Sequence, residues 1–472
     1  MSRPEPPPRR AVAIRSDDLE ALREIVRTRP ADYGCRARAV PDERGGYTLY
    51  ALVEPDQHDA MRTAGIDVEV LADEVPGERR ARATVGAGDR FDGGRIAPRG
   101  RGSRPENDQD VGPIMNVDEI GSAVQGLVDE YGIGTFSTPH PTHEGAGGEG
   151  GLVGGVNPDD YHVYFTAGVH ARERGGPDNI IYFIADLLYA QRHGTGLTYG
   201  SRSYTNAEVL TALRCGIVFF PLVNPDGVRF DQRTDSLWRK NRNPASSTAG
   251  DPLSIGVDIN RNYDFLWDFK THFHPSVITS TSLASDDPHD ETFHGPAVFS
   301  EPETRNVAWV FDAFPRIRWY MDIHSAAGDV LYNWGDDNDQ SSDPAQNFRN
   351  PVWDHRRGRL GIADYKEWID EPDFGKVIRS ARRTAAAMSA VGGRAYRPLQ
   401  ASGLYPTSGA SDDYALARHT LDPRSNKVYG FTMEFGHPTN FYPTVAEFQA
   451  NIVDTAAGFM EFCLAAADLG LA

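Results

Sequence analysis

The first 70 or so residues alternate short apolar stretches with helical patterns, which predicts a small α+β unit. Ala11–Arg15 has the composition of a strand, and Leu19, Leu22 and Ile25 form one apolar face of a helix that ends near Thr28. The elements expected after it are strands near Cys35–Val40 and Tyr47–Val53, a helix near Pro55–Ala64 and a strand at Asp67–Leu71. The order βαββαβ is typical of a ferredoxin-like domain.

The pattern then stops between Asp73 and Pro113, where the chain is rich in Gly, Arg and Pro and has no apolar period. This composition predicts a flexible linker, in which Arg79-Arg80 and the run Arg95 to Arg104 are open to a trypsin-like protease. An uncleaved spacer is the alternative. The predicted boundaries are a disordered tail at 1–10, the small domain at 11–73, the linker at 74–112 and a large domain at 113–472.

The large domain alternates longer apolar runs with helical patterns over about 360 residues. Buried strands are predicted in the runs Val163–Val169, Ile217–Val223, Trp319–Ile323 and Val428–Met433. Apolar helices are predicted near Asn179–Ala190, Glu303–Phe314, Gly375–Val391 and Val445–Ala466. Continuous apolar strands that alternate with helices are typical of α/β proteins. We therefore predict a mixed, mostly parallel central sheet with helices on both faces.

The composition narrows the class of function. The 472 residues include 48 basic and 67 acidic side chains, and the formal charge of −19 repels a phosphate backbone, so no nucleic-acid partner is expected. An acidic surface suits cationic peptide substrates, although such surfaces also serve solubility alone. The three cysteines are widely spaced and odd in number, which does not predict a disulfide framework.

No apolar run approaches the roughly 18 residues that are needed to cross a bilayer, so no membrane partner is expected. The first ten residues lack the apolar region of a secretory signal. These two observations predict a cytoplasmic protein, with secretion as the alternative. We also expect a monomer.

Polar clusters follow the apolar runs, where open α/β sheets bind their ligands. His170 and Glu173 follow the first run, and a spacing of three lets both reach one metal ion, although the pair alone also fits a surface loop. His324 comes directly after the run Trp319–Ile323. Two histidines and one glutamate with an open fourth position are a known arrangement for catalytic zinc. The three side chains together predict one Zn²⁺ ion.

Glu434 is a single carboxylate inside the apolar stretch Phe431–Gly436. Because an unpaired buried carboxylate is costly, Glu434 is either a functional group or part of a structural salt bridge. The remaining polar clusters are Asn224–Gly227, Leu237–Arg242, Gly256–Tyr263 and Leu404–Tyr414.

Taken in order, these clusters resemble those of the zinc carboxypeptidases of the A, B and T types. The resemblance covers about Val117–Leu464, and the ordered set is more specific than any one cluster. The gap between His170 and His324 is longer than that family leads us to expect, and the extra length falls in loops 246–252 or 270–290, near the cleft. The resemblance implies a zinc carboxypeptidase fold and a metallocarboxypeptidase that uses a zinc-activated water.

The resemblance also implies a role for each catalytic side chain. His170, Glu173 and His324 are the zinc ligands, and Glu434 is the general base that deprotonates the attacking water. Arg239 polarises the scissile carbonyl and stabilises the oxyanion.

Other residues are implied to bind the substrate. Asn260 and Arg261 hold its terminal carboxylate, Tyr405 closes over its C-terminal residue, and Arg172 is a further arginine on the substrate side. Because Asn260 and Arg261 need a free carboxylate, the reaction implied is that of an exopeptidase. The partners expected are peptides or proteins with a free C-terminus.

Asp412 matches the base of the pocket for the leaving C-terminal residue. An aspartate there goes with Lys or Arg, whereas an apolar residue goes with apolar side chains. Leu404, Thr407 and Thr432 match the walls of the same pocket, and their mixed character also admits apolar residues. The hypothesis is a preference that is basic-leaning, or dual for basic and apolar residues.

The N-terminal unit resembles the inhibitory prodomain of the family in its topology alone. A prodomain would cover the cleft until the linker is cut, which adds an activating protease to the expected partners. Two alternatives remain open: a zinc peptidase or amidase of the same superfamily that acts on cell-wall peptides, and a non-catalytic binding module.

Overall fold

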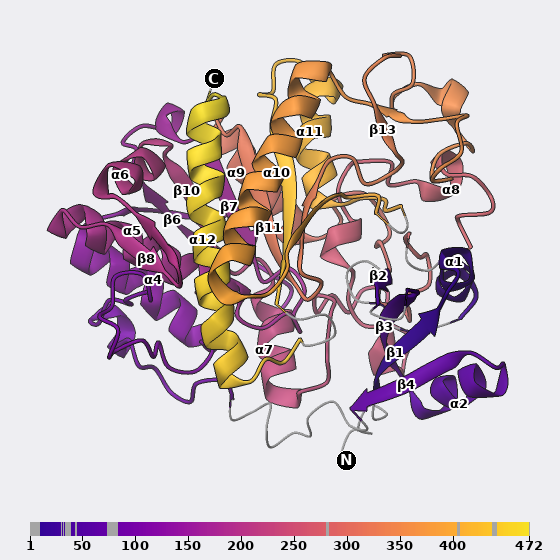
Figure 1. The fold of residues 1–472 in the computed structure, drawn as a ribbon, viewed down its shortest axis with the longest axis horizontal. Coiled ribbons are helices and arrows are strands. Elements are labelled where there is room, and N and C mark those ends of the chain that lie inside the picture. Colours follow the sequence, from indigo (N-terminus) through magenta and orange to yellow (C-terminus); the bar gives the residue numbers. More distant parts are fainter. Residues whose placement is uncertain are drawn as a thin grey trace.

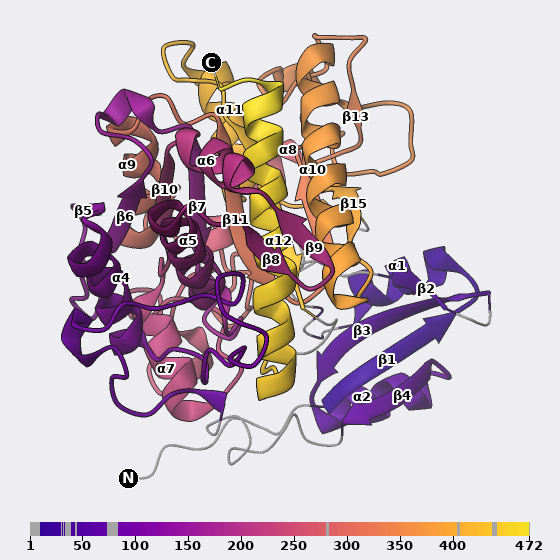
Figure 2. The same cartoon turned by 60° about the vertical axis from the view of Figure 1, so that its left-hand side comes forward.

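A computed structural model describes residues 10–29, 31, 33, 39–42, 45–72, 84–279, 283–403, 406–436 and 441–471. The chain forms a small N-terminal α+β unit beside a much larger α/β unit (Figures 1 and 2). Each unit has a hydrophobic core of its own. The prediction for residues 1–9 lies outside the described residues.

The small unit consists of β1 (Arg10–Ser16), α1 (Leu19–Thr28), β2 (Ala39–Pro41), β3 (Tyr47–Val53), α2 (Pro55–Thr63) and β4 (Asp67–Ala72). Its four strands pair antiparallel in the order β2-β3-β1-β4, and this is the ferredoxin-like arrangement expected for βαββαβ. Asp18 caps α1 by accepting from Glu20 N at 2.9 Å. Leu22 and Val26 of α1 pack against Val12 and Ile14 of β1.

The central sheet of the large unit has the strand order β15-β12-β16-β11-β7-β10-β6-β5. The bounds are β5 (Gly134–Ser137), β6 (Glu149–Val153), β7 (Val163–Ala167), β10 (Ile217–Phe220), β11 (Trp319–Ser325), β12 (Asp329–Tyr332), β15 (Arg397–Gln400) and β16 (Tyr429–Phe435). The middle strands β16, β11, β7 and β10 run parallel. The pairs β5–β6, β6–β10 and β12–β16 are antiparallel, and β15 pairs parallel with β12. The predicted mixed, mostly parallel sheet is confirmed.

Nine helices of the described residues surround this sheet: α4 (Val117–Tyr131), α5 (Gly176–His193), α6 (Asn206–Arg214), α7 (Pro225–Thr234), α8 (Phe269–His272), α9 (Pro302–Ala313), α10 (Glu371–Gly392), α11 (Ser411–Leu421) and α12 (Val445–Leu469). Two short ribbons complete the unit, β8 (Leu197–Tyr199) with β9 (Arg202–Tyr204) and β13 (Asp339–Gln340) with β14 (Glu367–Trp368). Within the described parts of the chain, no helix has the length and apolar character that a membrane crossing requires.

Alternate side chains of the central strands face opposite layers, because the side-chain period of a strand is two. Phe165 of β7 and Met321 of β11 point into the larger core, which α5, α10 and α12 cover. Tyr164 and Tyr320, one position away, point into a second core under α9 and α11. Helices therefore cover both faces, as predicted (Figure 2).

Residues 84–112 differ from the predicted flexible linker. Phe91 and Val111 lie in the large core, at 5% and 6% exposure, and Val85 pairs with Ile114. Asp186 of α5 accepts the backbone N–H groups of residues 102 and 103, at 2.8 and 2.9 Å. The glycine content of this segment predicted flexibility, but glycine here allows the backbone to approach its neighbours closely. A Cβ on Gly100 would lie 2.3 Å from the carbonyl oxygen of residue 182. Residues 73–83 lie outside the described residues.

Candidate active site and metal centre

The predicted ligands lie at the carboxyl ends of adjacent parallel strands. His170 and Glu173 follow β7, His324 is the sixth residue of β11, and Glu434 is the sixth residue of β16. The register pairs His324 with Glu434, and Asp322 with the Thr432 position two residues earlier. The sheet thus brings together residues that are more than 260 positions apart in the chain.

Two histidines and one glutamate present their ligand atoms to a common point. The Nδ1 atoms of His170 and His324 are 3.0 Å apart. Glu173 places Oε1 2.7 Å from Nδ1 of His170 and Oε2 2.9 Å from Nδ1 of His324. All three residues are buried, and their ligand atoms lie within 4.8 Å of one another, close enough for one metal ion.

Two aspartates orient the rings of these histidines. Nε2 of His170 lies 3.1 Å from Oδ1 of Asp258, and Nε2 of His324 lies 3.0 Å from Oδ2 of Asp322. A carboxylate at Nε2 favours the tautomer that carries its proton there, so the Nδ1 lone pair is free to bind a metal. The donor set therefore fits a zinc ion, which prefers neutral imidazole nitrogen and carboxylate oxygen.

Neighbouring charged groups keep two carboxyl groups of the site, those of Glu173 and Asp258, ionised. Burial opposes ionisation of Glu173, but His170 and His324 outweigh it and hold the pKa of that carboxyl well below its usual range. Burial likewise acts against Asp258, and Arg239 together with His170 lowers the pKa of Asp258 well below the ordinary value. Both carboxylates are therefore charged at neutral pH.

Arg239 is part of the same buried network. Its Nε and Nη2 atoms donate to Oδ2 of Asp258, at 3.1 and 2.9 Å. Its carbonyl oxygen accepts from the N–H of Ala171, at 3.1 Å, inside the loop that carries His170 and Glu173. The arginine and the metal ligands are thus held to each other by both side-chain and backbone bonds.

Asn260 and Arg261 lie in the short turn η4 (Ile259–Arg261), which Asp258 caps. Oδ1 of Asn260 accepts from Ser411 N at 2.8 Å, and Nη1 of Arg261 lies 4.0 Å from Oδ2 of Asp258. One aspartate therefore contacts a metal ligand, Arg239 and the Asn260–Arg261 pair. The structure brings these sequence-predicted residues together.

Asp412 lies in the first turn of α11 and is fully buried. Its Oδ2 accepts from Oγ1 of Thr432 and its Oδ1 accepts from Asp413 N, both at 3.0 Å. Thr407 is buried nearby in the chain, where its N–H donates to the carbonyl oxygen of Gly335 at 2.8 Å. The predicted pocket residues Leu404 and Tyr405 lie outside the described residues.

Arg172 lies between His170 and Glu173 in the chain, and its side chain is fully buried. Its Nη1 donates to Oε2 of Glu291 at 2.6 Å and to the carbonyl oxygen of Leu237 at 3.4 Å. The guanidinium also lies over the ring of Phe441, 4.5 Å from its centroid. Glu434 is buried as well, at 2% exposure, which agrees with its place in an apolar strand.

Sequence reasoning missed three partners of the predicted residues. Asp322 had a usable signal, because it lies two positions before His324 on one strand and so faces the same side. Asp258 stood inside a recognised polar cluster but without a role. Glu291 had no local signal, since its contact with Arg172 joins residues 119 positions apart.

A second group with metal-site spacing consists of His143, Glu301 and Glu303. Its central carboxylate, Glu301, is already a hydrogen-bond acceptor for Asn241 and Asn243, at 2.7 and 3.0 Å. We therefore describe this group as a polar cluster that joins the segment after Arg239 to the start of α9.

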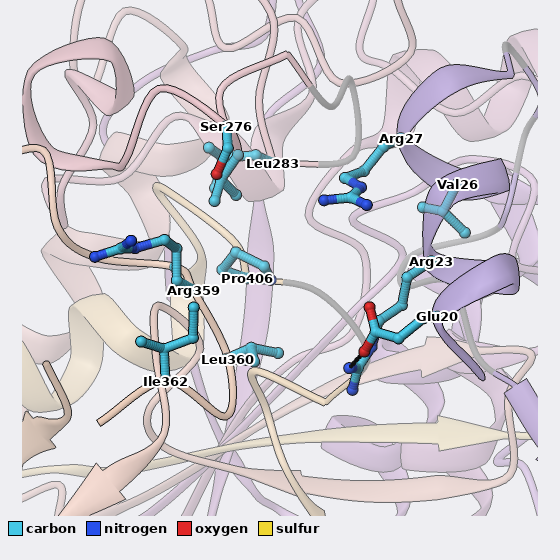
Figure 3. Close-up of a pocket in the computed structure, with 12 residues that line it drawn as sticks. Glu20, Arg23, Val26, Arg27, Ser276, Leu283, Arg359, Leu360, Ile362 and Pro406 are labelled. Atoms are coloured by element: carbon cyan, nitrogen blue, oxygen red, sulfur yellow. Dashed lines mark hydrogen bonds and ion pairs between the residues drawn. The ribbon is translucent and has the colours of Figure 1, made fainter. Parts of the chain in front are cut away.

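A cavity of about 210 Å³ is lined by residues of both the small unit and the large one (Figure 3). Arg23 and Arg27 of α1 line one side, and Arg359, Leu283 and Pro406 are among the residues on the other. Elsewhere the two units are in direct contact, in an apolar cluster formed by Ala11, Leu52, Leu237, Phe441 and Tyr442. The small unit therefore rests on the segments that surround Arg172.

Comparisons with known proteins identify the family of the chain. The family model of the zinc carboxypeptidases matches residues 115–458, more than half of the chain, and the chain belongs to that family. The chain is 26% identical to carboxypeptidase B of Astacus astacus over 57% of this chain and 73% of that protein. It is 27% identical to carboxypeptidase B of Bos taurus, over 57% of this chain and 53% of that protein.

Solved structures extend the likeness of the fold to the N-terminal unit. The structure of thrombin activatable fibrinolysis inhibitor superposes with a TM-score of 0.66, at 17% identity, over 98% of this chain and 99% of that one. Carboxypeptidase A from Helicoverpa armigera gives a TM-score of 0.64, at 17% identity, over 98% of both chains. Both matches show a shared fold that includes the small unit as well as the large one.

Proposed function

We propose that this protein is a zinc-dependent carboxypeptidase that hydrolyses the C-terminal peptide bond of peptides or proteins. The observation that carries the proposal is the position of Asp258. It contacts the metal ligand His170 and Arg239, and it caps the turn that carries Asn260 and Arg261. A group that activates water and a group suited to a terminal carboxylate thus belong to one rigid network.

Each residue of this network has a separate role in the reaction. A zinc ion held by His170, Glu173 and His324 supplies Lewis acidity, which lowers the pKa of water and polarises a carbonyl. Glu434 faces His324 across the strand pair and accepts the proton of the attacking water. Arg239 donates to the carbonyl oxygen as its negative charge develops.

Substrate binding fixes which bond is cleaved. Arg261 and Asn260 hold the free C-terminal carboxylate by charge-assisted hydrogen bonds, so the scissile bond is the last one. Asp412 receives the side chain of the leaving residue, which favours Lys or Arg. Thr432 and Thr407 give the pocket walls a mixed character that also accepts apolar side chains. The preference is therefore basic-leaning or dual.

The test is release of amino acids from peptides that end in Arg, Lys, Phe or Glu, with bound metal measured in parallel. The wild type should release Arg and Lys and contain one zinc ion. Glu434→Gln keeps the shape of the side chain but removes the base, so it should lose about 10²–10⁴-fold in kcat while keeping its zinc. Release from none of these peptides by zinc-loaded wild type would contradict the proposal.

The alternatives give different results in the same assay. A peptidase or amidase for cell-wall peptides would leave the linear peptides intact and cleave a diaminopimelate-containing muropeptide, whose free amino group also suits Asp412. A binding module would cleave neither. Asp412→Asn tests the pocket itself: it should lower kcat/KM for C-terminal Arg about 30-fold relative to Phe. An unchanged ratio would exclude the proposed basic pocket.

We further propose that the small N-terminal unit restrains the enzyme. In support, Ala11 and Leu52 of this unit pack on Leu237 and Phe441, and both of these residues contact Arg172. A substrate that reaches Arg172 must therefore approach next to the covered surface. An activating protease would act in the segment between the two units.

This second proposal predicts that a chain starting at Thr84 has a higher kcat/KM than the full-length protein. The matched control is the full-length chain with Leu52→Asp, which places a charge in the apolar contact. That variant should gain activity without any cleavage. Equal activity of all three proteins would contradict the restraint.

A further inference from the structure

The loop from Ser285 to Phe293 carries a concentration of acidic side chains at the edge of the active site. Its ends are closed by two backbone bonds, Ser285 N to the carbonyl oxygen of residue 292 at 3.1 Å and His294 N to that of Ser285 at 3.0 Å. The loop contains four carboxylates: Asp286, Asp287, Asp290 and Glu291. Its first residues belong to loop 270–290, one of the two loops in which the sequence predicts the extra length between His170 and His324.

Three of these carboxylates bind partners at the periphery. Asp286 pairs with Lys270 and lies 2.9 Å from Nε2 of His294. Asp287 lies 2.7 Å from Nδ1 of His289. Asp290 accepts from Oγ of Ser285 at 2.6 Å.

Glu291 points inward instead and accepts from Nη1 of Arg172 at 2.6 Å. The two partners differ in exposure: the Arg172 side chain is 0% exposed and the Glu291 side chain is 28% exposed. The cation is therefore hidden and the anion reaches solvent. Of the two charged groups, the carboxylate is therefore the one that a group approaching from solvent can reach.

The active site itself fixes the loop in place. Nζ of Lys240 donates to the carbonyl oxygen of Pro288 at 2.5 Å, and Lys240 directly follows Arg239. The carbonyl oxygen of Phe293 accepts from Asp258 N at 2.8 Å. Because the residue that orients His170 and Arg239 also holds the end of the loop, Glu291 keeps a defined distance from the chemistry.

The direction of the substrate follows from the proposed function, on which this inference rests. The C-terminal residue occupies the side of the site with Arg261 and Asp412. The residues upstream of the cleaved bond must then leave past the other side. We assign Arg172 and Glu291 to that side: Arg172 belongs to the loop of His170 and Glu173 and donates to the carbonyl oxygen of Leu237, next to Arg239, and Glu291 is its partner.

We propose that Glu291 is a specificity-determining residue for the two positions upstream of the cleaved bond. By pairing with Arg172, it removes the attraction that an isolated arginine would exert on acidic side chains. Its partly exposed carboxylate favours Lys or Arg at these positions instead. The enzyme thus selects against acidic residues just before its C-terminal target.

The experiment compares full-length wild type, Glu291→Gln and the control Asp286→Asn. The substrates are peptides with one constant C-terminal Arg and either Lys, Gln or Glu at both upstream positions. Wild type should cleave the Lys peptide with the highest kcat/KM and the Glu peptide with the lowest. Glu291→Gln should shift the Lys-to-Glu ratio about fivefold toward the Glu peptide. Asp286→Asn removes a charge from the same loop but not from Arg172, so it should leave the ratio unchanged.

A second variant distinguishes the loss of the charge from a folding defect. Glu291→Asp keeps the charge but shortens the side chain, so it should keep the wild-type order Lys, Gln, Glu. A ratio in Glu291→Gln within twofold of wild type would overturn the inference, as would an equal shift in Asp286→Asn. Release from no peptide by wild type would overturn the proposed function as well, whereas release with an unchanged ratio overturns this inference alone.

Discussion

At the scale of single residues, the groups beside each ring nitrogen set the orientation and the tautomer of the two histidines of the metal centre. Each ring has Nε2 beside a buried aspartate, Asp258 or Asp322, and Nδ1 beside Glu173. This asymmetry selects one tautomer in both rings. The aspartates therefore help to form the metal site although they are not among its three candidate ligands.

Replacing one of these aspartates should weaken metal binding. Asp258→Asn keeps the shape of the side chain but removes the charge that stabilises the ligand tautomer of His170. We expect a zinc affinity 10- to 100-fold lower, measured by competition with a chelator. Asp186→Asn is the control, because Asp186 is equally buried but holds residues 102 and 103. Unchanged affinity in Asp258→Asn would contradict this role.

At the scale of elements, the strand ends decide which residues meet. In β11 and β16 the register places His324 opposite Glu434, and a shift by one residue would turn one of them to the other face. Just before α11, the chain lies against the turn that carries Asn260 and Arg261. Gly409 makes a close approach there, with φ +66° and a position where a Cβ would lie 2.3 Å from the carbonyl oxygen of Arg261.

Gly409→Ala should therefore damage substrate binding as well as stability. The left-handed conformation alone costs about 1–2 kcal/mol for a residue with a Cβ, and the clash displaces Arg261 in addition. We expect a raised KM for C-terminal substrates together with a lower melting temperature. Gly393→Ala is the matched control: its φ is +72° but nothing lies within 4 Å of its Cβ position.

The control should lose stability without any change in KM. If Gly393→Ala raises KM as much as Gly409→Ala does, the higher KM results from general destabilisation of the fold and not from displacement of Arg261. Differential scanning calorimetry and initial-rate kinetics on the same samples distinguish the two.

At the scale of the whole molecule, the segment 84–112 belongs to the large unit. It contributes Phe91 and Val111 to the main core, and Nη1 of Arg101 donates to the carbonyl oxygen of residue 449 at 2.7 Å, on α12. A boundary at residue 113 therefore divides a packed structure. The arginines between 95 and 104 lie in this ordered part, so a protease would have to act before residue 84 to leave the core intact.

Two truncated chains test this boundary. A chain starting at Pro113 loses Phe91 and Val111, and the loss of a buried Phe side chain alone costs about 3–5 kcal/mol. A chain starting at Thr84 retains both residues and should unfold like the large unit of the full-length protein. Urea unfolding followed by circular dichroism measures the difference. Equal midpoints for the two chains would show that the segment adds nothing to stability.

The amino-acid sequence determined the layout of both units because period and local composition are properties of the chain itself. The apolar runs Val428–Met433 and Ala11–Arg15 each predict a strand from local composition, and both segments form one. The ligand set was also visible, because His170, Glu173 and His324 follow strands, and strand ends converge in a parallel sheet.

Only the tertiary structure decided which partners these residues have. Asp258 lies 88 positions from His170, and Glu291 lies 119 positions from Arg172. Contacts over such separations depend on how the loops cross the end of the sheet, and no local pattern encodes that path. The packing of residues 84–112 was hidden for the same reason. Glycines of this segment lie in close contact with residues of α5 that are distant in the chain. Composition alone therefore indicated flexibility where the fold requires close contact.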